Sequence, residues 1–450
     1  MKRNQRSELP AKIDMKVEEL YAYFLKHPLI TTDTRSITTG SIFFALKGDH
    51  FNGNEFAAQA LEAGACYAVI DEQPYKNDDR YLLVNDVLHS LQELARYHRK
   101  QLKIPVIGIT GTNGKTTTKE LVNAVLAQKF KTYATRGNLN NHIGVPLTIL
   151  SIDAKIEIAI IEMGANHMGE IAFLCEIAQP QYGLITNVGK AHLEGFGSFE
   201  GVKKAKGELY DWLAEHEGIL FLQQDNEELV NMANQRTFKH IISYGTRDDH
   251  TVWGQVYASN PNLAIQWYAE QGAIQEEVTT NLTGRYNLEN VLAAIAIGVT
   301  FGLSPNEINS GLAQYRPTNN RSQIKKTLNN MVICDYYNAN ASSMQAALEN
   351  LDQIEGTNKG VILGDMFELG EESYKEHLRV IKEVMNMKLK YRMFVGKAFY
   401  AHRNEIGEQG ECYSCLDEVI RRLSKNPIKD ALILLKASRG MTFEEILNYL

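Results

Sequence analysis

The sequence predicts an α/β protein of three domains, in which a central, mostly parallel sheet lies between two smaller α/β units. Short apolar runs alternate with helical segments along most of the 450 residues, a pattern typical of parallel sheets that helices cover on both faces. One of these runs leads directly into a glycine-rich turn at 111–114 and then into a helical segment. A polar stretch at 316–320 precedes a second alternating series. We therefore place the domains at residues 1–101, 102–314 and 315–450.

The first domain contains two predicted strands with a helix between them. Residues 41–46 (SIFFAL) and 66–71 (CYAVID) are short apolar runs, and residues 54–63 form an alanine-rich helical segment. Polar loops at 32–36 and 47–53 adjoin these elements. Loops on a rigid scaffold often bind ligands, but composition alone fits a binding loop and an ordinary turn equally well.

The central domain supplies the predicted parallel sheet. Its strands are the runs VIGIT, IEIAIIEM, YGLITNV, GILFL and HIISYG. Residues 251–282 are more polar and predict antiparallel strands, and alanines at helical spacing predict a helix at 287–301. In the third domain the runs MVICDYY, GVILGDM, RMFVG and DALILLK predict a smaller doubly wound, Rossmann-like sheet.

Composition narrows the class of protein. The formal net charge is -7 and no long basic block occurs, which argues against a nucleic-acid or membrane-surface partner. The chain contains no run of 18 apolar residues that predicts a membrane span, and its charged first residues lack the apolar core of a signal peptide. We therefore expect a cytoplasmic protein.

The odd number of cysteines, 5 in all, predicts reduced thiols. Cys412 and Cys415 have the spacing of a redox motif, but we expect two incidental thiols that do not open a helix after a strand.

Residues 105–120, PVIGITGTNGKTTTKE, have the order of a phosphate-binding loop: buried strand, glycine turn, helix. The glycines let backbone N–H groups approach phosphate oxygens, and the helix N-terminus adds positive potential. Lys115 would reach the β- and γ-phosphates, and the hydroxyl of Thr116 would hold Mg²⁺. The glycines fall at 108, 111 and 114, whereas the general pattern places one where Ile109 stands. The segment predicts a nucleotide-using enzyme whose nucleotide-binding residues are Gly111, Thr112, Asn113, Gly114, Lys115, Thr116 and Thr117.

Two further polar groups follow predicted strands of the same sheet. Glu162 ends the run IEIAIIE, and the carboxyl ends of parallel strands form the ligand-binding edge. We expect its carboxylate to bind a metal ion beside the phosphate loop rather than to be a solvated strand end. His192 follows the next strand within NVGKAHLEG, where it fits a core histidine or a loop ligand. The lysines of KKAKGE (203–208) have the pattern of a solvated helix face.

Together these segments resemble the Mur ligases, ATP-dependent amide-forming enzymes of peptidoglycan synthesis that are related to folylpolyglutamate synthetase. The motifs that carry the resemblance span nearly the whole chain and are GITGTNGKTTT, TRGNLNNHIGVP, EMGANHMGEI, NVGKAHLEGFGS, DYYNAN and LGDMFELG. The last two, with EMGA, are most similar to the family members that add D-alanyl-D-alanine to UDP-N-acetylmuramoyl-tripeptide. The resemblance implies a UDP-binding first domain, an ATP-binding central domain and a role in cell wall biogenesis, and hence in cell shape and cell division.

The resemblance also implies a set of nucleotide and metal contacts. It places Thr116 and Glu162 on one Mg²⁺, and His192 and Lys206 on a second. In this family the lysine is carbamylated by CO₂, which makes it an anionic oxygen ligand, whereas an ammonium cannot bind a cation. The family's contacts to ATP correspond to Asn287, Asn290, Arg321 and Asp335. One departure is Tyr286, because the family usually has histidine before the first of these asparagines.

The substrate residues implied by the resemblance fall into three groups. The uridine diphosphate group corresponds to Asp33, Thr34, Arg35, Ser36 and Lys47. The muramoyl-peptide group corresponds to Thr135, Asn138, Asn140 and Asn141. The group facing the incoming dipeptide corresponds to Asn338 and Asn340, with Asp365 and Glu368.

These residues predict a two-step ligation. ATP phosphorylates the carboxylate of the tripeptide, and the amine of D-alanyl-D-alanine then attacks the acyl phosphate. The alternatives are another amino-acid ligase of the family, a folylpolyglutamate synthetase-like enzyme and, more distantly, a nucleotide-binding protein without turnover. The third residue of the tripeptide, meso-diaminopimelate or lysine, stays open, and we expect a monomer.

Overall fold

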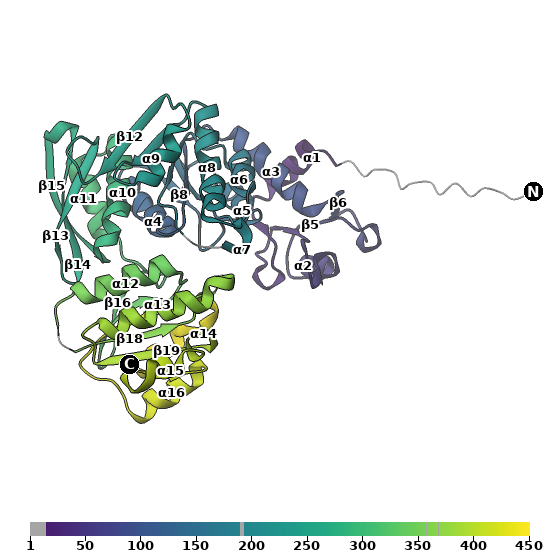
Figure 1. Ribbon diagram of the computed structural model, residues 1–450. Coiled ribbons are helices and arrows are strands. Elements are labelled where there is room, and N and C mark those ends of the chain that lie inside the picture. The colour runs from purple at the N-terminus through teal and green to yellow at the C-terminus, as the bar shows by residue number, and fades with distance from the viewer. Residues whose placement is uncertain (1–14, 190–192, 357, 368) are drawn as a thin grey trace, which may run out of the picture.

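The computed structural model describes residues 15–189, 193–356, 358–367 and 369–450. The predicted site residues His192 and Glu368 lie outside these ranges. The described residues form three main sheets in chain order, and each sheet belongs to one of three α/β units (Figure 1). The predicted α/β class and the three-unit architecture are thereby confirmed, whereas the exact domain boundaries remain a prediction.

The first unit is a four-stranded parallel sheet. Its order is β1-β2-β5-β6. The strands are β1 (Ile30–Thr31), β2 (Ile42–Phe44), β5 (Tyr67–Ile70) and β6 (Tyr81–Leu83), and a small hairpin consists of β3 (Lys47–Gly48) and β4 (Phe51–Asn52). Its helices are α1 (Val17–Lys26), α2 (Ala57–Glu62) and α3 (Val87–Gln101). Both predicted strands and the alanine-rich helix are present in shorter form.

Helix α3 joins the first unit to the central one. It contacts α1 on one side and α5 (Gly144–Leu150) and α6 (Glu170–Ala178) on the other. The buried guanidinium of Arg99 donates to the carbonyl oxygens of Ala178 at 2.7 Å and Gln179 at 3.0 Å. Since these carbonyls belong to the end of α6, the arginine supplies partners that a helix C-terminus lacks.

The central unit is a nine-stranded sheet of order β15-β14-β13-β12-β11-β10-β7-β9-β8. Strands β8 to β13 pair in parallel, and β13, β14 and β15 pair antiparallel, as the more polar sequence predicts. The strands are β7 (Val106–Thr110), β8 (Thr132–Ala134), β9 (Ile158–Glu162), β10 (Tyr182–Ile185), β11 (Ile219–Gln223), β12 (His240–Gly245), β13 (Val252–Ser259), β14 (Asn262–Ala269) and β15 (Ile274–Thr283). The remaining helices are α4 (Lys115–Leu126), α7 (Leu193–Phe196), α8 (Phe199–Glu215), α9 (Glu227–Asn234), α10 (Leu288–Thr300) and α11 (Pro305–Gln314).

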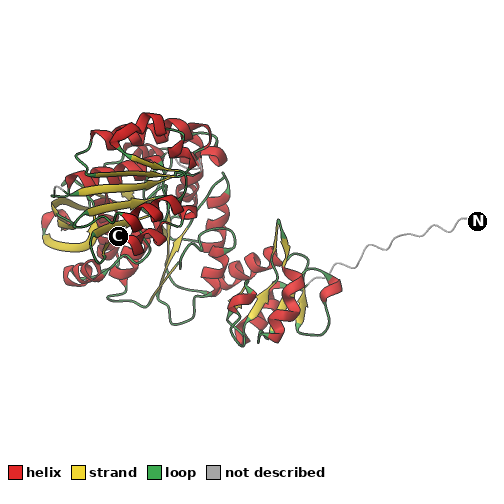
Figure 2. Cartoon of the chain, turned by 90° about the horizontal axis from the view of Figure 1, so that it is seen from below, coloured by secondary structure: helices red, strands yellow, loops and turns green. Residues whose placement is uncertain are grey.

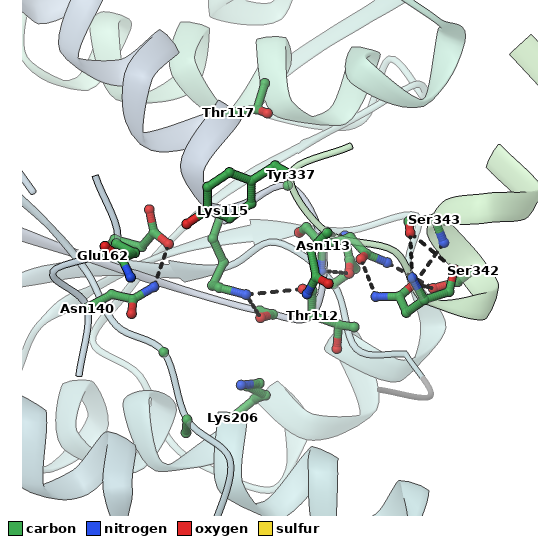
Figure 3. A pocket seen from close by; sticks show the side chains of 18 of the residues that line it. Thr112, Asn113, Lys115, Thr117, Asn140, Glu162, Lys206, Tyr337, Ser342 and Ser343 are labelled. Atoms are coloured by element: carbon green, nitrogen blue, oxygen red, sulfur yellow. Dashed lines mark hydrogen bonds between the residues drawn. The ribbon is translucent and has the colours of Figure 1, made fainter. Parts of the chain in front are cut away.

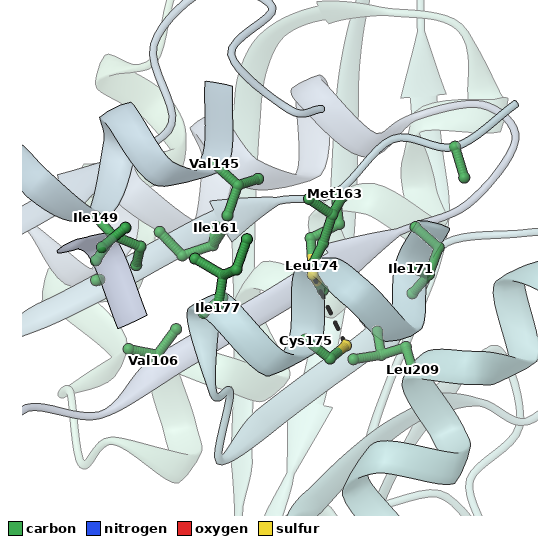
Figure 4. Close-up of a cluster of buried hydrophobic side chains, with 14 of the residues drawn as sticks. Val106, Val145, Ile149, Ile161, Met163, Ile171, Leu174, Cys175, Ile177 and Leu209 are labelled. Atoms are coloured by element: carbon green, nitrogen blue, oxygen red, sulfur yellow. Dashed lines mark hydrogen bonds between the residues drawn. The ribbon is translucent and has the colours of Figure 1, made fainter. Parts of the chain in front are cut away.

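Helices cover both faces of this sheet at its central strands β7, β9 and β10, which explains why these strands are apolar throughout. In β9, Ile158 and Ile160 belong to one buried cluster, with side chains of α4 and α10. Their neighbours Ala159 and Ile161 belong to the other, with side chains of α5, α6 and α8 (Figure 4). Successive side chains of a strand point to opposite faces, so a strand buried on both faces has no polar alternation.

The third unit is a six-stranded sheet of order β16-β17-β21-β18-β19-β20. All pairs are parallel except that of β16 with β17. The strands are β16 (Gln323–Lys326), β17 (Met331–Asp335), β18 (Lys359–Gly364), β19 (Tyr391–Val395), β20 (Glu411–Tyr413) and β21 (Leu432–Lys436). The helices are α12 (Ala341–Gln353), α13 (Ser373–Asn386), α14 (Lys397–Tyr400), α15 (Arg403–Ile406) and α16 (Leu416–Lys425). Figure 2 shows the strands between layers of helices.

The thiols match one expectation and contradict another. All five cysteines are free. However, Cys412 lies in β20 and Cys415 is the N-cap residue of α16. The two cysteines therefore do stand where a strand leads into a helix. Sequence patterns missed β20 because it has only three residues. In the described part of the chain, no helix is both long and apolar enough to cross a membrane.

Candidate active site

The phosphate-binding loop connects β7 to α4 as the sequence predicts. Gly111 and Gly114 have φ angles of +143° and +78°, a region that side chains with a Cβ rarely adopt. A Cβ atom on Gly111 would collide with the hydroxyl of Thr186, and one on Gly114 would lie 2.6 Å from Oδ1 of Asn290. The loop therefore needs glycine at both positions. Because the first amides of a helix have no intrahelical partner, the start of α4 offers N–H groups to an anion.

A segment after β10 holds this loop in place. The N–H of Thr112 donates to the carbonyl oxygen of Asn187 at 2.9 Å, and the N–H of Asn113 donates to Oδ1 of Asn187 at 3.0 Å. The hydroxyl of Thr186 donates to the carbonyl oxygen of Asn113 at 2.6 Å. Gly189 completes the contact by donating its N–H to the hydroxyl of Thr112 at 2.9 Å. The loop thus has a fixed shape before any ligand is considered.

Lys115 lies over the loop that it follows. Its ammonium donates to the carbonyl oxygens of Gly111 at 2.7 Å and Thr112 at 3.1 Å (Figure 3). Burial lowers the pKa of Lys115 to about 8, opposed by the carboxylate of Glu162 and reinforced by Arg321. A cation in this position is held by the loop and shares the cavity with any phosphate bound there.

Glu162 ends β9 directly beside the first turn of α4. Its Oε1 accepts hydrogen bonds from the hydroxyl of Thr116 at 3.2 Å and from Nδ2 of Asn140 at 2.9 Å. Its backbone N–H donates to the hydroxyl of Thr135 at 3.0 Å. Its Oε2 is buried and has no hydrogen-bond partner among the described residues, although the ammonium of Lys119 lies 3.9 Å away.

An orphaned carboxylate oxygen next to a hydroxyl fits a divalent cation. Buried carboxylates normally have partners, and Mg²⁺ prefers hard oxygen ligands such as these two. The donor set of Thr116 and Glu162 is therefore compatible with Mg²⁺. No cluster of three or more His, Cys, Asp or Glu side chains that could hold a metal occurs among residues 15–189, 193–356, 358–367 and 369–450, so the remaining ligands would come from substrate or water.

Lys206 projects from α8 into the same cavity (Figure 3). Only 3% of this residue is exposed, and within the described part of the chain its ammonium has no hydrogen-bond or ion-pair partner. The ring centre of Phe196 lies 5.3 Å from Nζ. Burial, together with the nearby charge of Lys115, lowers the pKa of Lys206 to about 7, although Glu170 and Glu208 oppose the shift. A solvated face, the reading that the charge pattern of its helix favours, is therefore wrong for this lysine.

Two predicted nucleotide contacts form a buried chain of side chains behind the loop. Asn287 donates to the carbonyl oxygen of Thr283 at 2.7 Å and accepts from Nδ2 of Asn290 at 2.9 Å. Oδ1 of Asn290 accepts from the hydroxyl of Thr118 at 2.9 Å. The hydroxyl of Tyr286, which stands at the departure from the family pattern, lies 2.7 Å from that of Ser322 in the third unit. The asparagines thus link α10 to α4.

The third unit contributes basic and aromatic groups from the opposite side. The guanidinium of Arg321 lies 3.9 Å from the ring centre of Tyr337, and its buried Nε has no hydrogen-bond partner among the described residues. Arg439 donates to the hydroxyl of the same tyrosine at 3.1 Å. Asp335 pairs with the ammonium of Lys436 at 2.6 Å.

The phosphate-binding loop, the polar residues around it in the central unit and the groups of the third unit line one cavity of about 890 Å³. This cavity lies between the central and third units. The predicted residues that line it are Gly111, Thr112, Asn113, Gly114, Lys115, Thr117, Asn138, Asn140, Asn141, Glu162, Lys206, Asn287, Asn290, Arg321, Asp335, Asn338 and Asn340. The structure thus brings together residues that lie more than two hundred positions apart in the chain.

Other predicted residues lie elsewhere. Thr135 is buried behind Glu162 and supports its backbone. Asp365 is also buried, and its carboxylate accepts from the N–H groups of Ala398 and Phe399 at 3.0 Å each. Lys47 pairs with Asp71 at 2.8 Å, and the segment Thr34–Ser36 is a short helical turn in the first unit. Asp33 and Arg35 of this region form an exposed ion pair at 2.8 Å.

Sequence reasoning missed several residues that line the cavity or shape it. Tyr337, Ser342, Phe367 and Arg439 line it from the third unit, and Glu170 and Glu289 line it from the central one. Tyr337 lies within the motif DYYNAN and Glu170 within EMGANHMGEI, so their motifs were the available signal. The role of Asn187 in holding the loop had no signal beyond its place after a strand.

Family models match the chain in three consecutive segments. "Mur ligase family, catalytic domain" matches residues 28–107, "Mur ligase middle domain" matches 109–298, and "Mur ligase, glutamate ligase domain" matches 320–439. A UDP-N-acetylmuramoyl-tripeptide–D-alanyl-D-alanine ligase of Bacillus subtilis (strain 168) is 35% identical over 428 residues, covering 93% of this chain and 92% of the relative. The enzyme of the same name from Escherichia coli (strain K12) is 35% identical over 427 residues, covering 94% and 93%.

Solved structures of Mur ligases also match nearly the whole chain. MurF from Acinetobacter baumannii matches with a TM-score of 0.81 at 30% identity, covering 93% of this chain and 92% of that one. MurF from Thermotoga maritima in complex with ADP matches with a TM-score of 0.82 at 26% identity, covering 94% and 97%. A folylpolyglutamate synthase of Thermotoga maritima, at 12% identity and a TM-score of 0.61, shares the fold. With three family models in order and relatives aligned over nearly their full length, the chain belongs to the Mur ligase family.

Proposed function

We propose that this protein is the ATP-dependent ligase that joins D-alanyl-D-alanine to UDP-N-acetylmuramoyl-tripeptide, giving UDP-N-acetylmuramoyl-pentapeptide, ADP and phosphate. The relatives from Bacillus subtilis and Escherichia coli carry that name and align over nearly their whole length. The observation that carries the chemistry is the shared cavity, in which the phosphate loop and Glu162 face basic groups of the third unit. Such a cavity suits a reaction that transfers phosphate and then joins two substrates.

The carboxylate of the tripeptide needs activation because it is a poor electrophile with a negative charge. Phosphoryl transfer from ATP to this carboxylate forms an acyl phosphate and releases ADP. The amine of D-alanyl-D-alanine then attacks the carbonyl carbon, an amide bond forms, phosphate leaves and the amine loses a proton. Lys115 is placed to stabilise negative charge on the transferring phosphoryl group.

Two residues would hold Mg²⁺ beside the phosphates: Thr116 through its hydroxyl and Glu162 through its carboxylate. A bound Mg²⁺ neutralises charge that develops on phosphate oxygens. Asn140 orients Glu162 by donating to Oε1. His192, which the family resemblance assigns to a second Mg²⁺, lies outside the described residues, and that assignment stays a prediction.

Lys206 is suited to carbamylation. A lysine with a pKa of about 7 is largely neutral at slightly alkaline pH, and a neutral amine attacks CO₂ to form a carbamate with release of a proton. The carbamate would be an anionic oxygen ligand for the second Mg²⁺. The low exposure of Lys206 would protect the carbamate from solvent.

The substrate sites extend over all three units in this proposal. Residues 33–36 and Lys47 of the first unit would bind uridine diphosphate. The muramoyl-peptide would be bound by Asn138, Asn140 and Asn141, and the dipeptide by Asn338 and Asn340. Because the cavity lies between the central and third units, their approach would complete the site and exclude water. We also propose a monomer located in the cytoplasm, as the sequence predicts.

The test is ATP-dependent phosphate release with UDP-N-acetylmuramoyl-tripeptide and three acceptor conditions: D-alanyl-D-alanine, a single amino acid, or none. The proposal predicts release only with D-alanyl-D-alanine, together with a pentapeptide product of the expected mass. Release with a different acceptor alone would assign the protein to another member of the family. Absence of release under every condition would favour a nucleotide-binding protein without turnover.

A further inference from the structure

The side chain of Asn113 joins the phosphate loop to the third unit. Its Oδ1 accepts a hydrogen bond from Nδ2 of Asn340 at 2.8 Å, and its Nδ2 donates to the hydroxyl of Ser342 at 2.9 Å (Figure 3). The hydroxyl of Ser342 donates in turn to Oδ1 of Asn340 at 3.0 Å. The three side chains therefore form a closed ring of hydrogen bonds between two units.

The backbone of Asn113 is occupied as well. Its N–H donates to Oδ1 of Asn187, and its carbonyl oxygen accepts from Thr186 at 2.6 Å and from Nδ2 of Asn187 at 3.2 Å. Each hydrogen-bonding group of Asn113 thus has a protein partner. A phosphate that accepted from the backbone N–H of Asn113 would have to displace Asn187, whereas the amides at the start of α4 are available without such a cost.

The partners of Asn113 lie at the start of α12. Asn340 is the N-cap residue, and its Oδ1 accepts from the N–H of Ser343 at 2.8 Å within a capping box. Since this cap fixes the first turn of α12, a bond to Asn340 orients the helix rather than a loose loop. The predicted acceptor residue Asn338 directly precedes this turn, and both line the cavity.

A second contact fixes the same helix near its other end. Nδ2 of Asn350 donates to the hydroxyl of Thr283 at 3.1 Å, and both residues are buried. The carbonyl oxygen of Thr283 is the acceptor for Asn287 in the chain that reaches α4. Helix α12 therefore meets the central unit at two points, which together set its direction across the cavity.

We propose that Asn113 is a positioning residue for the acceptor step: its side chain docks α12 onto the phosphate loop and so aligns the acceptor residues of the third unit with the bound phosphates. In this role the Asn113 side chain is not a nucleotide ligand. This inference rests on the proposed function only for the identity of the acceptor, because the docking contact itself is independent of it.

The test uses the full-length protein and the variants Ser342→Ala, Ser342→Thr and Asn113→Ala. Ser342 is exposed, so its substitution does not endanger the fold, and threonine retains the hydroxyl as a matched control. Losing one such hydrogen bond should lower kcat/KM for D-alanyl-D-alanine by about 3- to 10-fold. The dissociation constant of ADP, measured by calorimetry, should stay within about twofold of the wild-type value in Ser342→Ala. Ser342→Thr should have the wild-type kcat/KM for D-alanyl-D-alanine.

Two further readouts make the result decisive. The variant Asn113→Ala should act in the same direction, and the double variant should cost less than the product of the two single effects, because both remove the same contact. A fall in ADP affinity that matches the loss in kcat/KM would overturn the proposal, as would Ser342→Ala with unchanged acceptor kinetics. If the wild type does not use D-alanyl-D-alanine, the proposed function fails, and small-angle scattering then tests the docking contact alone. A larger radius of gyration for Ser342→Ala than for the wild type supports the contact. Identical scattering curves overturn it.

Discussion

The hydroxyl of Thr116 donates a hydrogen bond of 3.2 Å to Oε1 of Glu162. This contact joins the first turn of α4 to the end of β9, so that two oxygen ligands from distant parts of the chain lie side by side. The second carboxylate oxygen is buried without a hydrogen-bond partner among the described residues. An oxygen of this kind is stabilised when a cation binds it, and the contact therefore leads to a prediction about magnesium.

Glu162→Gln should weaken the response to magnesium. Glutamine keeps an oxygen that can accept from Thr116 and Asn140, but it removes the negative charge that a divalent cation needs. We expect the Mg²⁺ concentration for half-maximal rate to rise at least about 10-fold, with a lower rate at saturation. A magnesium titration of ATP-dependent phosphate release measures both. Glu157→Gln, at an exposed position just before the same strand, is the control, and an equal effect in both variants would contradict the assignment.

Lys115→Met should remove a charge that acts on the transferring phosphoryl group. Methionine preserves most of the side-chain volume but carries no charge, so we expect a folded protein with a loss of about 10²- to 10³-fold in kcat/KM. Steady-state kinetics and a melting curve provide the measurement. Lys131→Met, which changes an exposed lysine outside the cavity, should be indistinguishable from the wild type. A loss of less than tenfold for Lys115→Met would exclude the role proposed for this lysine.

Lys206 should make stability depend on pH. Its pKa is about 7 in the folded protein and near the ordinary 10.5 in the unfolded chain. Between these values the unfolded chain binds more protons, so the contribution of Lys206 to stability is greatest above about pH 10.5 and is lost progressively as the pH falls to about 7. In CO₂-free buffer, Lys206→Met should therefore be more stable than the wild type at pH 7, by roughly 3 to 5 kcal/mol at most, and this difference should shrink towards pH 10.

Urea unfolding at several pH values measures this difference. The control is Lys204→Met, because Lys204 is exposed on the same helix and its substitution should produce no such trend. A difference between Lys206→Met and the wild type that does not vary from pH 7 to pH 10 would show that Lys206 titrates normally.

Removal of CO₂ should lower the activity. If Lys206 acts as a carbamate, degassed buffer should reduce the rate of phosphate release and added bicarbonate should restore it, because carbamate formation is reversible. Lys206→Ala should have low activity that bicarbonate does not change. Equal rates with and without bicarbonate, after exhaustive removal of CO₂, would argue that the amine is not carbamylated.

The inner parallel strands of the central sheet could be predicted because burial on both faces leaves a strong sequence signal, whereas the three-residue edge strand β8 was missed. Apolar runs such as that of β9 contain no polar alternation, and the glycines at 111 and 114 marked the turn into α4. Elements with little burial or few residues gave weaker signals. Strands β16 and β20, with four and three residues, were missed because edge strands of this length lack a distinctive pattern.

The residues at strand ends could be proposed from position, but their contacts could not. Sequence placed Glu162 and the phosphate loop at one edge of the sheet, and the structure shows them hydrogen-bonded. It could not show that Lys206 faces the cavity, since a charged helix segment is usually solvated. Nor could it show that Thr135 supports the backbone of Glu162 or that Asp365 caps α14, because such roles depend on packing between distant segments.

The central claim is that this chain activates the tripeptide by transferring phosphate to its carboxylate. The most direct test uses UDP-N-acetylmuramoyl-tripeptide labelled with ¹⁸O in its terminal carboxylate, with ATP, Mg²⁺ and D-alanyl-D-alanine. Our account predicts that each phosphate released carries one ¹⁸O atom from that carboxylate and that one pentapeptide forms for each phosphate. Unlabelled phosphate accompanying pentapeptide formation would contradict an acyl phosphate, and with it the mechanism proposed for this site.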